Sequence, residues 1–158
     1  MVRNSQNEHL AKMYRLDEKK EWLKRYSHLL NEIKELQEEH RRIMEMAVSL
    51  SPSYGDKVIH SREDGLQKAV DELVEIGERI VKDAADISRA RDEIVSAITS
   101  MPIGKERDVL WQRYILGKTF EQISESLSFD QRYILRIHQK ALIAIDIALP
   151  ERAEGIDA

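Results

Sequence analysis

The residues best suited to chemistry in this chain are four side chains that lie close together between positions 131 and 136. They are Gln131, Arg132, Leu135 and Arg136. Arginine can donate two hydrogen bonds to the edge of guanine, glutamine can pair with the edge of adenine, and leucine can contact the methyl group of thymine. We therefore expect these residues to read the base edges of duplex DNA.

A second set of residues suits the DNA backbone, which cations, polar side chains and helix N-termini contact without reading the sequence. Its members are Lys118, Thr119, Gln139 and Lys140. Thr119 stands three residues before Gln122, a capping-box spacing that predicts the start of a helix. The free amide groups at that helix start would point toward a phosphate.

Three short helices are needed to position both sets. Apolar spacing predicts them over 105–116, ending at Gly117, over 120–127, and from Asp130 to about Leu149. Two short helices joined by a tight turn, the second of them basic, are the layout of a helix-turn-helix. In DNA-binding proteins of this layout the second helix enters the major groove.

The first hundred residues are predicted to form two long helices, over about 6–50 and 63–100, joined by a loop at 51–62. Apolar residues recur in both at alternating steps of three and four, the heptad spacing of coiled-coil packing. The expected seam contains Leu29, Ile33, Leu36, His40 and Ile43 on the first helix, and Leu73, Gly77, Ile80, Ala84 and Ile87 on the second. We expect an antiparallel hairpin in which Arg91 stacks on Trp22.

The expected fold is all-α, with three parts: a hairpin and oligomerisation region at 1–101, the helix-turn-helix domain at 102–149, and a polar tail at 150–158. Pro102 and Gly104 mark the boundary between the first two. Apolar rows flank the heptad seams, and either a second copy of the chain or the C-terminal part would cover them. We therefore expect a homo-oligomer, a dimer or a tetramer.

The charge balance favours DNA binding by the C-terminal part only. The chain has 25 Lys and Arg against 29 Asp and Glu, a formal net charge of −4. Within residues 105–145, however, basic side chains outnumber acidic ones, so a surface for a polyanion is expected there. No apolar segment is long enough to span a bilayer, so we expect a cytoplasmic protein that does not bind membranes.

Metal, cofactor and enzyme chemistry are not expected. The chain has no Cys, and its five His are scattered. A di-iron helical bundle needs Glu three residues before His, whereas Gln37 holds that place before His40. There is no glycine-rich phosphate loop and no Ser–His arrangement of nucleophile spacing.

Residues 106–123 resemble region 4 of bacterial sigma factors, in the Arg113-Tyr114 pair, Gly117 and the cap at Thr119. Residues 130–142 resemble the recognition helix of that family, including its closing Lys-Ala-Leu. The resemblance implies that Gln131, Arg132 and Arg136 read bases beside Leu135, and that Thr119 and Lys140 contact the backbone. The sequence departs from the family pattern at Gln122, Ser124 and Ser128. Ser128 replaces a usual glycine, so it must accept a positive φ or alter the turn.

The helical front half, the Ser51–Val58 element and the sigma-like end together resemble small phage regulators of the RinA/ArpU type. That resemblance implies a sequence-specific transcriptional regulator of late or packaging genes, and we expect an activator of phage late genes in the bacterial host cell. Bacterial RNA polymerase is a candidate further partner. Two alternatives stay open. One is a DNA-packaging recognition protein like a small terminase, and the other is an adaptor that binds RNA polymerase and no DNA. The loop from Ser53 to Arg62 is either a structural hinge or a contact surface for flanking DNA or for RNA polymerase.

Overall fold

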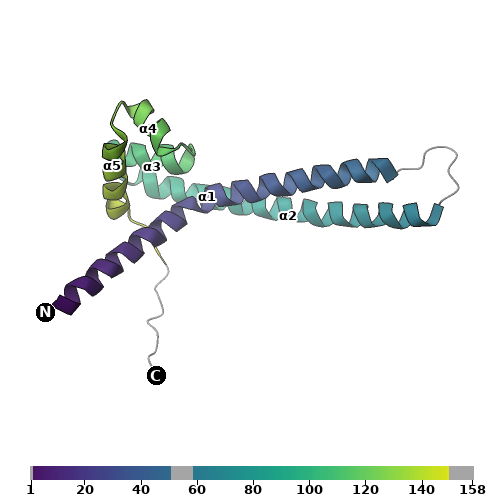
Figure 1. Ribbon diagram of the computed structural model, residues 1–158, viewed down its shortest axis with the longest axis horizontal. Helices are drawn as coiled ribbons and strands as arrows, with labels where there is room; N and C mark the ends of the chain where they lie inside the picture. Colours follow the sequence, from purple (N-terminus) through teal and green to yellow (C-terminus); the bar gives the residue numbers. More distant parts are fainter. Residues whose placement is uncertain (1, 51–58, 150–158) are drawn as a thin grey trace, which may run out of the picture. The chain divides into compact units, whose positions relative to one another are not determined.

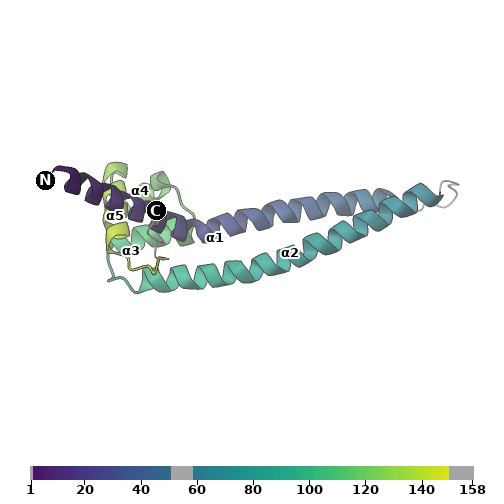
Figure 2. The same ribbon diagram turned by 90° about the horizontal axis from the view of Figure 1, so that it is seen from below.

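The computed structural model describes residues 2–50 and 59–149, and every regular element in these ranges is helical. In chain order the elements are α1 (Val2–Leu50), α2 (Ile59–Thr99), α3 (Lys105–Leu110), a π-helical turn η1 (Trp111–Ile115), α4 (Phe120–Leu127) and α5 (Gln131–Ala144). The two long helices run antiparallel beside each other (Figure 1), and a second view agrees (Figure 2). The all-α prediction and the helical hairpin are confirmed. Most of the Ser53–Arg62 loop lies outside the described residues.

The chain divides into two compact units, His28–Ala90 and a second unit made of Met1–Ser27 with Arg91–Ala158. The sequence predicted a division near residue 102 instead. The structure differs because Leu23 of α1 and Ile94 and Ile98 of α2 are fully buried in one core with residues of α3 and α5. Each long helix therefore contributes one stretch to each unit.

The unit His28–Ala90 is a plain two-helix pairing. Its core contains Ile43 and Ala47 of α1 and Ala69 of α2. Partly buried side chains of α2 complete the core: Leu66, Leu73 and Ile76. Burial of these side chains is what holds the two helices together here.

Of the five seam residues predicted on α2, Ala84 alone is exposed, while Gly77 is half-buried like the three leucine and isoleucine positions. Leu73, Ile80 and Ile87 are half-buried, but Ala84 is exposed and Asp83 is buried in its place. Ile76 likewise packs into the core beside the predicted Gly77. Starting from Leu66, the residues on the inner face of α2 are spaced by three and then four positions, whereas the predicted seam is spaced by four and then three. The observed and predicted patterns therefore coincide at every seventh residue. On α1 the predicted seam residues Leu29, Ile33, Leu36 and His40 are half-buried, and Ile43 is buried.

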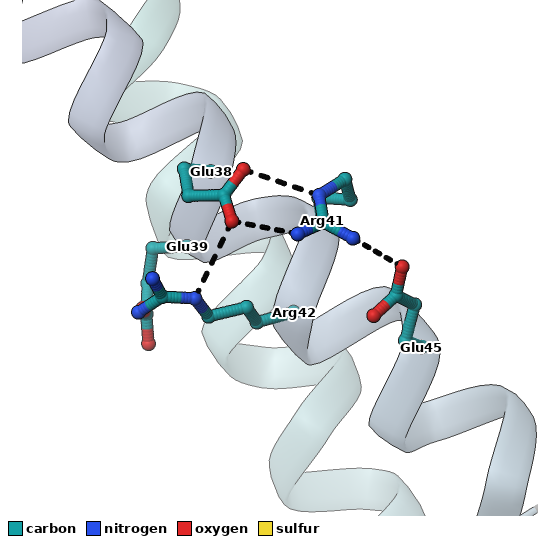
Figure 3. Close-up of polar contacts among 5 residues, drawn as sticks. All are labelled: Glu38, Glu39, Arg41, Arg42 and Glu45. Carbon is teal, nitrogen blue, oxygen red and sulfur yellow. Dashed lines mark hydrogen bonds and ion pairs between the residues drawn. The ribbon is translucent and has the colours of Figure 1, made fainter.

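The solvent side of α1 in this unit carries a network of ion pairs between residues one helical turn apart (Figure 3). Arg41 pairs with Glu38 and Glu45, and Arg42 pairs with Glu38 and Glu39. Hydrogen bonding from Arg41 lowers the pKa of Glu38 below its usual value. Because all of these groups are exposed to water, the network supports the helix without adding much to stability.

In the second unit the C-terminal helices share one core with residues of α1 and α2. Leu110, Leu142 and Ile145 are almost completely buried with Leu23, Ile94 and Ile98. At its edge the guanidinium of Arg25 lies 4.5 Å from the ring centre of Trp22 and pairs with Glu93 at 2.7 Å. The cation on Trp22 is therefore Arg25, and the predicted stacking of Arg91 is wrong.

Helix α5 ends at Ala144, five residues before the predicted end at Leu149. Ile145 takes an extended conformation, with φ −66° and ψ 132°. Ile145 and Ile147 are buried in the core of the unit. Leaving the helix lets both side chains reach that core, so the helix stops before the sequence signal at Pro150.

Candidate nucleic-acid interface

Helix α5 packs against α3, and α4 packs against α5 and η1, so that α4, the turn and α5 have the layout of a helix-turn-helix. The small core between them contains Val109 of α3, Ile123 of α4, and Ile134 and Ile137 of α5, all almost completely buried. Three partly buried aromatic and aliphatic side chains close its edge: Phe120, Leu127 and Phe129. This packing fixes which face of α5 points away from the protein.

The turn between α4 and α5 adopts a left-handed conformation at Ser128, with φ 56° and ψ 42°. Glycine favours this conformation, so the serine is held in a strained backbone region. Ser124 Oγ donates a hydrogen bond to the carbonyl of Phe129, and the Phe129 amide donates to the carbonyl of Ser124 at 3.1 Å. Asp130 takes the N-cap position of α5 without a side-chain hydrogen bond.

The start of α4 is capped as the sequence predicts. Thr119 Oγ1 accepts a hydrogen bond from the Gln122 amide at 3.2 Å, and the Thr119 amide donates to Gln122 Oε1 at 2.9 Å. This is a complete capping box in which a glutamine occupies the N3 position, where glutamate is also common. Thr119 is exposed, so its hydroxyl proton and the helix start are accessible to a phosphate.

The outward face of α5 carries two parallel rows of exposed side chains. One row is Gln131, Leu135 and Gln139, and the other is Arg132, Arg136 and Lys140. Residues four apart lie above one another on a helix, so each row runs along the axis. The four predicted base-reading residues are thus brought together on one exposed surface. Among the described residues, none of the three cations in the second row is in an ion pair.

Lys118 is placed differently from its predicted role. Its side chain is half-buried, and Nζ donates to Gln112 Oε1 at 2.9 Å and lies 3.3 Å from Ser126 Oγ. Its backbone amide donates to the carbonyl of Gln112 at 3.0 Å, which closes the end of η1 before Gly117. Lys118 therefore holds the connection to α4, and a phosphate would have to compete with these partners.

A buried hydrogen bond of 2.8 Å joins Tyr114 Oη in η1 to His138 Nε2 in α5. The edge of the His138 ring also meets Phe120 of α4, with ring centres 4.9 Å apart. Burial lowers the pKa of His138 to about 4, helped by the charges of Lys20 and Arg113, and burial raises the pKa of Tyr114 to about 12. Both groups are therefore neutral near pH 7, and the pair connects η1, α4 and α5.

Sequence reasoning missed the contribution of α1. Lys19 Nζ donates hydrogen bonds to the carbonyls of Leu142 at 2.9 Å and Ile145 at 2.7 Å, at the C-terminal end of α5. These carbonyls lack partners within the helix, and a cation there also complements the helix dipole. The contact joins residues more than 120 positions apart, so no local pattern in the sequence could have indicated it.

A groove of about 440 Å³ lies between α1 and α5. Leu135 and Gln139 line it from α5. Two of the three residues in the first outward row therefore lie beside α1 as well as being exposed to solvent. The side chains that face them from α1 include His9, Met13 and Lys20. The predicted contact residue Gln139 is thus exposed, but beside a second helix.

No protein-family model, no curated protein and no solved structure matches this chain. Within residues 2–50 and 59–149, no three His, Asp or Glu side chains gather where they could hold a metal ion. In the same part of the chain, no helix is both long and apolar enough to cross a membrane.

Proposed function

We propose that this chain is a sequence-specific regulator of transcription that binds duplex DNA through α5. On this proposal α5 enters the major groove, which admits one α-helix. The resemblance to RinA/ArpU-type regulators suggests activation of phage late genes in the cytoplasm of a bacterial host. Direct contact with RNA polymerase is part of the same proposal.

The observation that carries the proposal is the pair of outward rows on α5. Glutamine and arginine side chains that can bond adenine and guanine edges stand exposed on one helix face, while the opposite face is buried against α3 and α4. An ordinary solvated helix needs no such combination of unpaired arginines and glutamines on one face. Thr119 and Lys140 flank the face where backbone contacts are expected.

The proposal includes a homo-oligomer, a dimer or a tetramer. On α2, Val70, Val74 and Val81 are 43%, 56% and 71% exposed, and they recur at near-heptad spacing beside Gly77, whose Cβ position is open. A second copy packed on this row would remove it from water. Two linked recognition helices would gain avidity that one weakly basic domain lacks.

The test is binding of the full chain to DNA fragments tiled across the region that surrounds its gene, at two salt concentrations, with the mass measured in the same buffer. Selective, salt-sensitive binding by a dimer or tetramer is the expected result. Closed rings of many copies would favour DNA packaging instead. No binding at low salt, with a stable RNA polymerase complex, would favour the adaptor.

A further inference from the structure

Helix α1 is held beside the recognition helix by specific contacts. Lys19 is bonded to the C-terminal carbonyls of α5, and Leu23, one turn further along α1, is fully buried in the core that contains Leu142. The stretch of α1 that precedes Lys19 therefore has a defined place next to α5. It lines the 440 Å³ groove with His9, Met13 and Lys20.

The groove lies on one side of the α5 reading face only. Its α5 lining includes Leu135, Gln139 and His138. At about 3.6 residues per turn, His138 falls on one side of the row through Leu135, and Arg136 falls on the other. The cationic row of α5 is thus turned away from α1, and the side nearest α1 has no cation of its own.

A major groove is bordered by two phosphate backbones, and a groove about 12 Å wide cannot admit two helices. When α5 occupies it, Lys140 faces one backbone. Helix α1, which lies on the other side of α5, would then be the part of this unit nearest the other backbone. Two lysines of α1 are available there. Lys20 lines the groove between α1 and α5. Lys12 is exposed on the same side of α1, three residues from His9 and four from Leu16.

We infer that the early turns of α1 form a second DNA-contact site, in which Lys12 and Lys20 bind the phosphates of the strand that α5 leaves uncovered. This inference rests on the proposed function. Lys20 is paired at present with Asp17 at 3.5 Å. An exposed pair of this kind is weak enough for a phosphate to displace the carboxylate. Asp17 also lines the groove, and its charge opposes the phosphate.

The experiment compares the salt dependence of DNA affinity for the full-length wild type and the double variant Lys12→Ala/Lys20→Ala. Each lost phosphate contact should lower the slope of log affinity against log salt by about 0.9, so a fall of about 1 to 2 is expected. The base preference should stay unchanged. The matched control is Lys34→Ala/Lys82→Ala, two exposed lysines of the other unit, which should keep the wild-type slope.

A third variant has the opposite expected sign. Asp17→Asn removes a negative charge from the groove and should tighten binding to every sequence. An unchanged slope in Lys12→Ala/Lys20→Ala, or tighter binding by it, would overturn the inference, because α1 would then be idle or obstructive. If the wild type itself shows no salt-dependent DNA affinity, the proposed function fails before the role of α1 arises.

Discussion

The two ends of the outward face of α5 have different chemical roles in the proposed complex. Gln131 and Arg132, near the start of the helix, are the residues best placed to reach base edges, since recognition helices insert their N-terminal turns. Lys140, two turns further on, is suited to a phosphate. Periodicity alone predicted which α5 side chains are exposed, because one face of a packed helix must be buried.

Other residues could not be placed from the sequence. Lys118 reads as a free cation, yet its ammonium is bonded inside the domain. Lys19 reads as one of many charges on a solvated helix, yet it caps α5. Both contacts depend on how distant segments pack, and residue type carries no signal for that.

His138 should make the protein less stable in mild acid. Its pKa is lowered from 6.5 to about 4 by burial and by Lys20 and Arg113, so the folded state binds fewer protons than the unfolded state between these values. The contribution of His138 to the free energy of unfolding is therefore complete above pH 6.5. As the pH drops toward 4 this contribution is lost, and the free energy of unfolding falls by up to about 3 kcal/mol.

Urea unfolding from pH 7.5 to 4.5 measures this effect, with His138→Gln as the comparison. The variant lacks the titrating group and should show a flatter dependence on pH, whatever its absolute stability. Parallel curves for the two proteins would show that another group sets the acid response.

At the level of helices, strong periodicity located every long element. Periodicity did not determine which face of α2 is buried. The row that faces inward contains Ala69, Ile76 and Asp83. An equally plausible heptad row contains Val70, Gly77 and Ala84. Sequence patterning favoured Ala84 over Asp83 because a buried carboxylate is unusual. The end of α5 was missed for a related reason, since Ile145 and Ile147 fit a helical pattern but reach the core only from an extended segment.

The turn before α5 offers a direct test of local strain. A non-glycine residue in the left-handed conformation costs about 1 kcal/mol, so Ser128→Gly should raise the free energy of unfolding by about 0.5–1 kcal/mol. Ser128→Val should lower it, because a β-branched side chain fits this conformation poorly.

Thermal or urea unfolding of the two variants measures both shifts, and DNA affinity should change little in Ser128→Gly. A destabilised glycine variant would mean that the Ser128 side chain stabilises the turn by more than its backbone strain costs.

For the molecule as a whole, the exposed valines of α2 are expected to join copies of the chain. The double variant Val74→Glu/Val81→Glu places charges on that row, so the assembly should dissociate and the mass in solution should fall to that of one chain. Ile103→Glu is the control, because Ile103 is 91% exposed away from the heptad row.

Sedimentation of the three proteins gives the masses, and circular dichroism verifies that the helices persist. DNA affinity should fall with the loss of linked domains. An unchanged mass in Val74→Glu/Val81→Glu would assign oligomerisation to another surface.

The central claim is that the outward face of α5 reads DNA sequence, and selection from randomised duplexes tests it most directly. The wild type should enrich one motif, Arg132→Ala should lose preference at one base position at a cost of about 1–3 kcal/mol, and Lys140→Ala should weaken all sequences alike. Enrichment of no motif by the wild type, or of the same motif by Arg132→Ala and Arg136→Ala with undiminished preference, would contradict the claim.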